Sequence, residues 1–183
     1  MAGSVAGVFS AWIADWHGIA AAGAYAVRAA QRSALSGRPV KFGVLTDEQA
    51  VELDAMVSQI IPADATPGAH EAGVVYFIDR SLATFASPSR LIYMQGFGEL
   101  QAKTQAMFPS SGKFSALSSA QQIQLLSAID TTPFFETVRD HTVIGMFASP
   151  RHGGNYQKAG WTLIGFEDTL SFKPPFGYYD AAQ

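Results

Sequence analysis

Apolar residues recur three and four positions apart along most of this chain, which is the spacing of one face of an α-helix. No alternation of apolar and polar residues longer than four positions stands out, so the pattern does not favour β-strands. We therefore expect a mostly α protein, a single domain of about five to seven helices. The expected helices lie within residues 1–36, 46–61, 66–86, 89–107, 118–129 and 132–147.

The helix expected at residues 46–61 carries the clearest local signals. Thr46 and Gln49 have the spacing of a capping box, in which each side chain accepts a hydrogen bond from the backbone amide of the other residue. Pro62 ends the helix because proline cannot continue the hydrogen-bond ladder. Four residues between these signals form an apolar stripe that should face the core: Leu53, Met56, Val57 and Ile60.

Capping residues and apolar stripes also predict the later helices. The residues expected to open them are Thr66-Pro67, Ser89, Ser118 with Gln121, and Thr132-Pro133. Gly96 and Gly98 weaken a helix, so a close helix contact or a kink is expected there. The wide apolar pattern of the last helix predicts that it is largely enclosed. The residues expected to face inward are Val74, Val75, Ile78, Leu82, Tyr93, Phe97, Leu100, Thr104, Met107, Ile123, Leu126 and Ile129.

The two ends of the chain differ from this helical core, which spans residues 45–148. Residues 1–36 are rich in alanine and are expected to be helical, whereas residues 149–183 are expected to be irregular. Four glycines and an asparagine between Pro150 and Phe166 disfavour a regular helix. This stretch is too apolar for a free linker, so it should be pinned to its own domain or to a partner. We expect Trp161 and Phe166 to pack back on the helices.

Composition narrows the classes of function. The net charge of −3 gives no reason to expect a nucleic acid or an anionic lipid as partner. The absence of cysteine excludes disulfides, cysteine-ligated iron–sulfur clusters and the C-x-x-C-H haem attachment. Polar residues interrupt the apolar N-terminal region, so no direct membrane span is expected.

No catalytic or metal motif emerges from the residues that could carry chemistry. The four histidines, His17, His70, His141 and His152, are not in metal-ligand spacing. A flavin or nicotinamide fingerprint needs a third glycine that the Gly96-Phe97-Gly98 run lacks. Asp140 and His141 are neighbours in an expected helix and point in different directions, which argues against a hydrolase dyad. No cofactor is therefore expected in this chain.

Two segments resemble the gluconate 2-dehydrogenase subunit 3 family. One runs from Leu45 to Leu82 and includes Ile60-Ile61-Pro62-Ala63-Asp64 and Thr66-Pro67-Gly68-Ala69. The other is the Pro150–Phe166 stretch with Phe147 and Ala148 before it. The resemblance implies a non-catalytic small subunit that binds and stabilises a large FAD-dependent dehydrogenase of the glucose-methanol-choline type. That complex would oxidise gluconate, glucose or a glycoside, with a cytochrome subunit as a further candidate partner.

The resemblance implies a periplasmic complex, with a cytoplasmic one as the alternative because residues 1–27 contain no Lys or Arg for an export signal. For the His152–Asn155 run, an anion-binding nest, a partner contact and a purely structural turn all remain open. Two other functions also remain open: a transient assembly or export factor, and a free-standing helical enzyme. The residues expected to contact a partner are His152, Asn155, Tyr156, Phe172, Phe176, Tyr178 and Tyr179.

Overall fold

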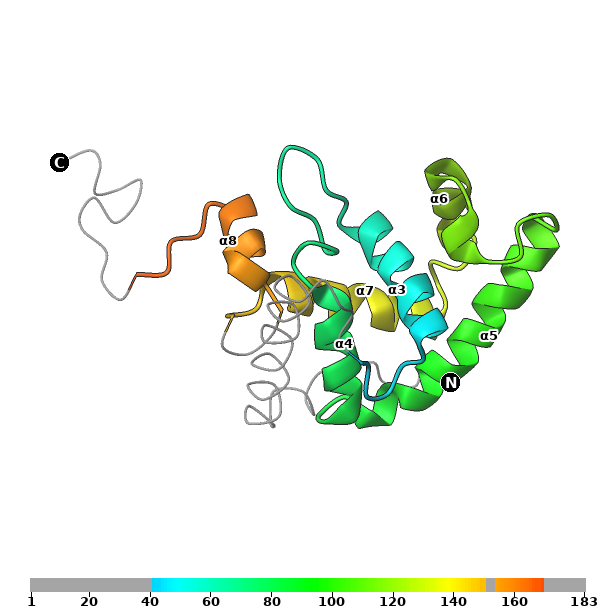
Figure 1. Cartoon of the computed structure of the whole chain (residues 1–183), viewed down its shortest axis with the longest axis horizontal. Helices are drawn as coiled ribbons and strands as arrows, with labels where there is room; N and C mark the ends of the chain where they lie inside the picture. The colour runs from blue at the N-terminus through cyan, green and yellow to red at the C-terminus, as the bar shows by residue number, and fades with distance from the viewer. Residues whose placement is uncertain (1–40, 151–153, 170–183) are drawn as a thin grey trace.

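All the regular structure in the described part of the chain is helical. A computed structural model describes residues 41–150 and 154–169 (Figure 1). The α-helices in these ranges are α3 (Asp47–Ile60), α4 (Val74–Ala83), α5 (Arg90–Met107), α6 (Ser119–Ser127), α7 (Pro133–Phe147) and α8 (Ala159–Leu163). Short 3-10 turns lie at η1 (Ser87–Ser89), η2 (Phe114–Ala116) and η3 (Tyr156–Lys158). The mostly α prediction is confirmed, and the helical N-terminal region predicted at residues 1–36 lies outside the described residues.

Capping side chains open three of these helices as predicted. At α3 the Gln49 amide donates to Thr46 Oγ1 (3.2 Å), and the Thr46 amide donates to Gln49 Oε1 (3.0 Å). Ser118 and Gln121 form the same box at α6, and Thr132 caps α7. Ser89 does not cap α5 with its side chain, because it belongs to η1 and already has a helical backbone.

Helix α4 begins eight residues later than the predicted Thr66 start. An Asp64 side chain that accepts from the Thr66 amide (2.8 Å) holds the connector in a turn. Gly73, with φ at 70°, then places a left-handed residue directly before the helix. The predicted inward face is nevertheless correct, since Val74, Val75, Ile78 and Leu82 are all buried.

Helix α7 lies at the centre and contacts α3, α4 and α5 (Figure 1). A Cβ on Gly96 of α5 would lie 2.0 Å from Cγ of Phe134 in α7, so the predicted close contact at Gly96 is confirmed. Gly98 faces open space and has no such contact. The core between these helices includes Leu53, Met56, Val57, Phe77, Ile78, Leu82, Leu125, Val138 and Met146.

One inward-facing prediction is wrong. Ile123 of α6 is 53% exposed, because it lies at an open groove beside Ile60 and Phe135 rather than under another helix. The prediction that the last helix is largely enclosed is confirmed, because only Pro133, Arg139 and Val143 of the 15 residues of α7 are exposed. No helix in residues 41–150 or 154–169 has the length and hydropathy that a membrane span requires.

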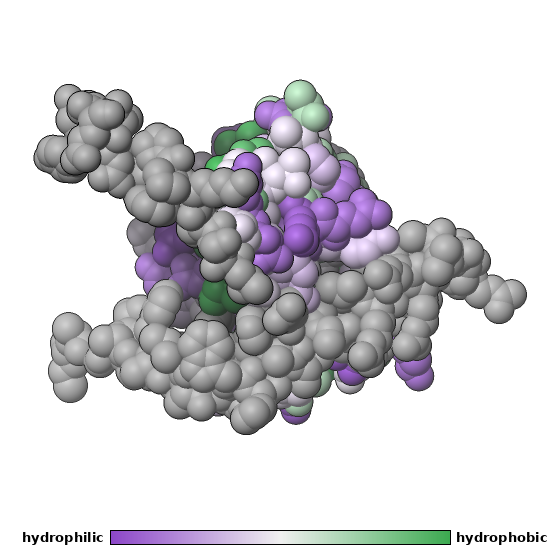
Figure 2. Space-filling model, turned by 90° about the vertical axis from the view of Figure 1, so that its left-hand side faces the viewer, coloured by the Kyte–Doolittle hydropathy of each residue, from purple (hydrophilic) through white to green (hydrophobic). Residues whose placement is uncertain are grey.

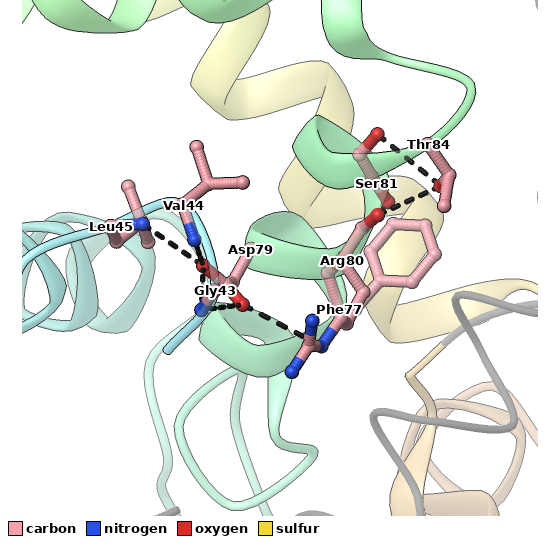
Figure 3. Close-up of polar contacts among 8 residues, drawn as sticks. All are labelled: Gly43, Val44, Leu45, Phe77, Asp79, Arg80, Ser81 and Thr84. Carbon is pink, nitrogen blue, oxygen red and sulfur yellow. Dashed lines mark hydrogen bonds and ion pairs between the residues drawn. The ribbon is translucent and has the colours of Figure 1, made fainter. Parts of the chain in front are cut away.

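A buried carboxylate fixes the segment before α3. Asp79 of α4 points at residues 43–45 and accepts from three consecutive backbone amides, those of Gly43 (2.9 Å), Val44 (2.8 Å) and Leu45 (3.0 Å) (Figure 3). The Arg80 Nε atom lies 3.7 Å from the same carboxylate. These hydrogen bonds satisfy a charge that would be costly to bury alone, and they tie the start of α3 to α4.

Candidate partner interface

The segment that follows α7 folds back onto that helix; we call residues 154–166 the C-terminal strap. Its turn is left-handed: Asn155, Gln157 and Lys158 have φ values of 46°, 55° and 60°. Asparagine adopts this conformation more readily than most residues, whereas for Gln157 and Lys158 it is unfavourable. The surrounding hydrogen bonds must therefore hold the turn.

The strap satisfies backbone carbonyls at the C-terminal end of α7, which have no partner within the helix. The Asn155 amide donates to Gly145 O (2.6 Å), and the Asn155 side-chain Nδ2 donates to Ala148 O (3.0 Å). Asn155 Oδ1 accepts from the Gly160 amide (2.8 Å), which closes the strap on itself. Trp161 Nε1 donates to Phe147 O (2.9 Å). These bonds seat the strap firmly on α7.

Two glycines allow the strap to come this close. A Cβ on Gly154 would lie 2.0 Å from Gly145 O, and a Cβ on Gly160 would lie 2.0 Å from Met146 O. The structural interpretation of the His152–Asn155 run is therefore confirmed for Gly154, whereas its other glycine, Gly153, lies outside the described residues. The prediction that the strap contains no regular helix is wrong, because residues 159–163 form α8, whose bonds to α7 were not visible in the sequence.

The structure describes two of the seven predicted contact residues. Asn155 was expected to contact a partner, which would need an exposed side chain, but it is fully buried because its side chain bonds both Ala148 and Gly160. Tyr156 is half-buried, and its amide donates to Ala72 O (3.2 Å). The Asn155 amide is used internally and is not available to an anion nest. The remaining five lie outside the described residues: His152, Phe172, Phe176, Tyr178 and Tyr179.

Exposed apolar side chains gather at the end of α8. Leu163, Ile164 and Phe166, which we call the α8 ridge, are 39%, 59% and 50% exposed. Phe166 was predicted to pack back on the helices, but it is exposed and contacts Trp161 within the strap. The centroids of the two rings are 4.9 Å apart, and Trp161 is half-buried. Figure 2 views the molecule from the side on which α8 lies in Figure 1, and this face carries hydrophobic next to hydrophilic residues. The ridge is therefore an apolar surface on a segment that hydrogen bonds hold against α7.

The described side chains form no evident catalytic group. His141 is buried in the core, where its Nδ1 lies 2.9 Å from the Tyr93 hydroxyl, and burial lowers the pKa of His141 to about 3. Asp140 faces Arg139 at 3.5 Å instead of pairing with His141. In residues 41–150 and 154–169, no group of three or more His, Asp or Glu residues could hold a metal ion.

Comparison with known proteins identifies one family. The model of the family described as gluconate 2-dehydrogenase subunit 3 matches residues 47–168, which is 122 of the 183 residues. Searches of curated proteins and of solved structures give no match. The matched range runs from the first residue of α3 through the strap and the α8 ridge. The chain therefore belongs to the gluconate 2-dehydrogenase subunit 3 family.

Proposed function

We propose that this chain is a non-catalytic subunit that binds and stabilises the FAD-dependent catalytic subunit of a sugar dehydrogenase complex. The observation that carries the proposal is the α8 ridge. Three apolar side chains within four residues, each at least 39% exposed, form a concentrated apolar surface within the range that matches the family. Such surfaces commonly mark contacts with another protein.

Because the strap that carries the ridge is already ordered, the ridge should bind a partner tightly. Burial of apolar surface contributes roughly 25 cal/mol per Å² removed from water. Part of that gain is lost when a flexible segment must become ordered on binding. Hydrogen bonds from Asn155 and Trp161 to the end of α7 already order the strap, so the ridge would bind with a small loss of conformational freedom.

The proposal assigns the chemistry to the partner. FAD would lie in a catalytic subunit of the glucose-methanol-choline type, which would oxidise gluconate, glucose or a glycoside. A cytochrome subunit is a further candidate in the same complex, and the periplasm is the proposed location. The aromatic residues Phe172, Phe176, Tyr178 and Tyr179 would extend the contact beyond the ridge.

Capture of the complex from its native cells tests this proposal. The tagged chain should retain a partner with a flavin absorption spectrum that reduces a dye when gluconate or glucose is added. Replacing Ile164 and Phe166 together with Asp should lower the recovered flavoprotein at least tenfold, while the circular dichroism of the chain stays unchanged. Met94→Asp is the matched control, because Met94 is 64% exposed on α5. Equal recovery with the ridge variant, or a partner without flavin, would contradict the proposal.

A further inference from the structure

A groove with an acidic side lies between α3 and the residues around α4. Its volume is about 380 Å³. Its apolar lining includes Val51 and the rings of Phe42 and Tyr76, which stack with centroids 5.3 Å apart. Val51 is 56% exposed. We call this site the α3–α4 groove.

The polar lining of the groove contains two carboxylates and one imidazole. Asp47 and Asp54 are seven residues apart on α3 and therefore share a face of that helix. His70 Nδ1 lies 2.7 Å from Asp54 Oδ2. The other Asp54 oxygen, Oδ1, is buried and has no hydrogen-bond partner within the part of the chain that the structure describes.

An unpaired buried carboxylate oxygen is unfavourable, so the groove has an acceptor for which a donor is missing. Rotation about the terminal torsion of an aspartate is easy and can turn either oxygen towards the groove. The carboxylates outnumber the imidazole, so the missing donor should be cationic. A planar guanidinium fits best, because it can bond a carboxylate with two N–H groups while it lies against an aromatic ring.

The loop that contributes His70 to the groove also contacts the strap. His70 lies two residues before Ala72, whose carbonyl accepts from the Tyr156 amide of the strap (3.2 Å). In Figure 1 the loop that precedes α4 lies between α8 and α3. A protein that covers the α8 ridge and extends across this loop would therefore reach the groove.

We propose that the α3–α4 groove receives an arginine side chain of the flavoprotein subunit, with the guanidinium against Asp54 and Asp47 and the aliphatic stem on Val51 and Tyr76. This inference rests on the proposed function, since it names the chemistry of the same partner. It predicts an interface in which the α8 ridge supplies apolar contact and the groove supplies a charge-specific contact.

The test measures the Kd between the full chain and the purified flavoprotein at 50 and 300 mM NaCl. Asp54→Asn should raise the Kd about tenfold at low salt and reduce its salt dependence, because a charge pair is lost. Asp54→Arg should weaken binding further by repulsion. Glu99→Gln is the control, since Glu99 is an exposed acid on α5. Thermal unfolding of each variant shows whether the fold is retained.

A double-mutant cycle identifies the partner residue. Each surface arginine of the flavoprotein is changed to alanine, and one such change should weaken wild-type binding but not the binding of Asp54→Asn. Two results would overturn this inference if ridge variants still weaken binding. One is a wild-type Kd for Asp54→Asn at both salt concentrations, and the other is that no arginine of the flavoprotein is coupled to Asp54. If the wild-type chain does not bind the flavoprotein, both this inference and the proposed function are wrong.

Discussion

At the scale of single residues, four polar side chains in the interior define how the helices meet. Asp79 joins α4 to the start of α3, and Asn155 joins the strap to α7. Tyr93 and His141 join α5 to α7 through a hydrogen bond and stacked rings 5.6 Å apart. The sequence did not reveal these roles, because apolar periodicity treats polar residues as surface. His141 does, however, lie seven residues after the buried Phe134, two helical turns along the same face.

The buried histidine predicts how stability depends on pH. Burial lowers the pKa of His141 from its ordinary value of 6.5 to about 3, so the unfolded chain binds one more proton between these values. The free energy of unfolding should therefore fall as the pH falls below 6.5, by up to about 1.4 kcal/mol per pH unit. Urea unfolding at pH 7, 6 and 5 measures this slope.

His141→Gln is the comparison that isolates the effect. It keeps a polar group near the Tyr93 hydroxyl but cannot take up a proton, so its slope between pH 6.5 and 5 should be flatter. Burial raises the pKa of Asp54 above its ordinary value, which gives a contribution of opposite sign that both proteins share. Equal slopes for the wild type and His141→Gln would show that His141 does not cause the pH dependence.

At the scale of elements, helices with sequence-encoded starts were predictable and those determined by tertiary contacts were not. Capping residues and long apolar stripes located α3 and α7, and the stripe alone located α5. The start of α4 was missed because Gly73 and the Asp64 turn break the pattern. Helix α8 has only five residues, too few for a period to be visible, and its bonds to α7 stabilise it.

A pair of glycine substitutions tests the seating of the strap. Gly160→Ala should destabilise the docking of α8, because its Cβ would lie 2.0 Å from a backbone oxygen of α7 that cannot easily move. Gly98→Ala is the control within α5; its Cβ meets nothing within 4 Å, so the better helix propensity of alanine should stabilise the chain by up to about 1 kcal/mol. Thermal unfolding and amide exchange at Asn155 and Tyr156 measure both effects. Wild-type protection of these amides in Gly160→Ala would contradict the account.

At the scale of the whole molecule, the described chain is a helical core around α7 that carries the strap, the α8 ridge and the α3–α4 groove. The sequence correctly suggested the gluconate 2-dehydrogenase subunit 3 family and directed attention to the C-terminal region. It could not locate the groove, because Phe42, Asp54, His70 and Tyr76 come from separate segments that only the fold brings together. It also could not show which apolar strap residues face solvent.

The half-life of the flavoprotein's dehydrogenase activity at elevated temperature tests the central claim most directly. A subunit that binds the folded catalytic chain stabilises it by mass action. Adding the wild-type chain should lengthen this half-life, and adding the Ile164 and Phe166 ridge variant should not. The isolated chain should oxidise neither gluconate nor glucose. An unchanged half-life with the wild-type chain, or sugar oxidation by the chain alone, would contradict its role as an accessory subunit.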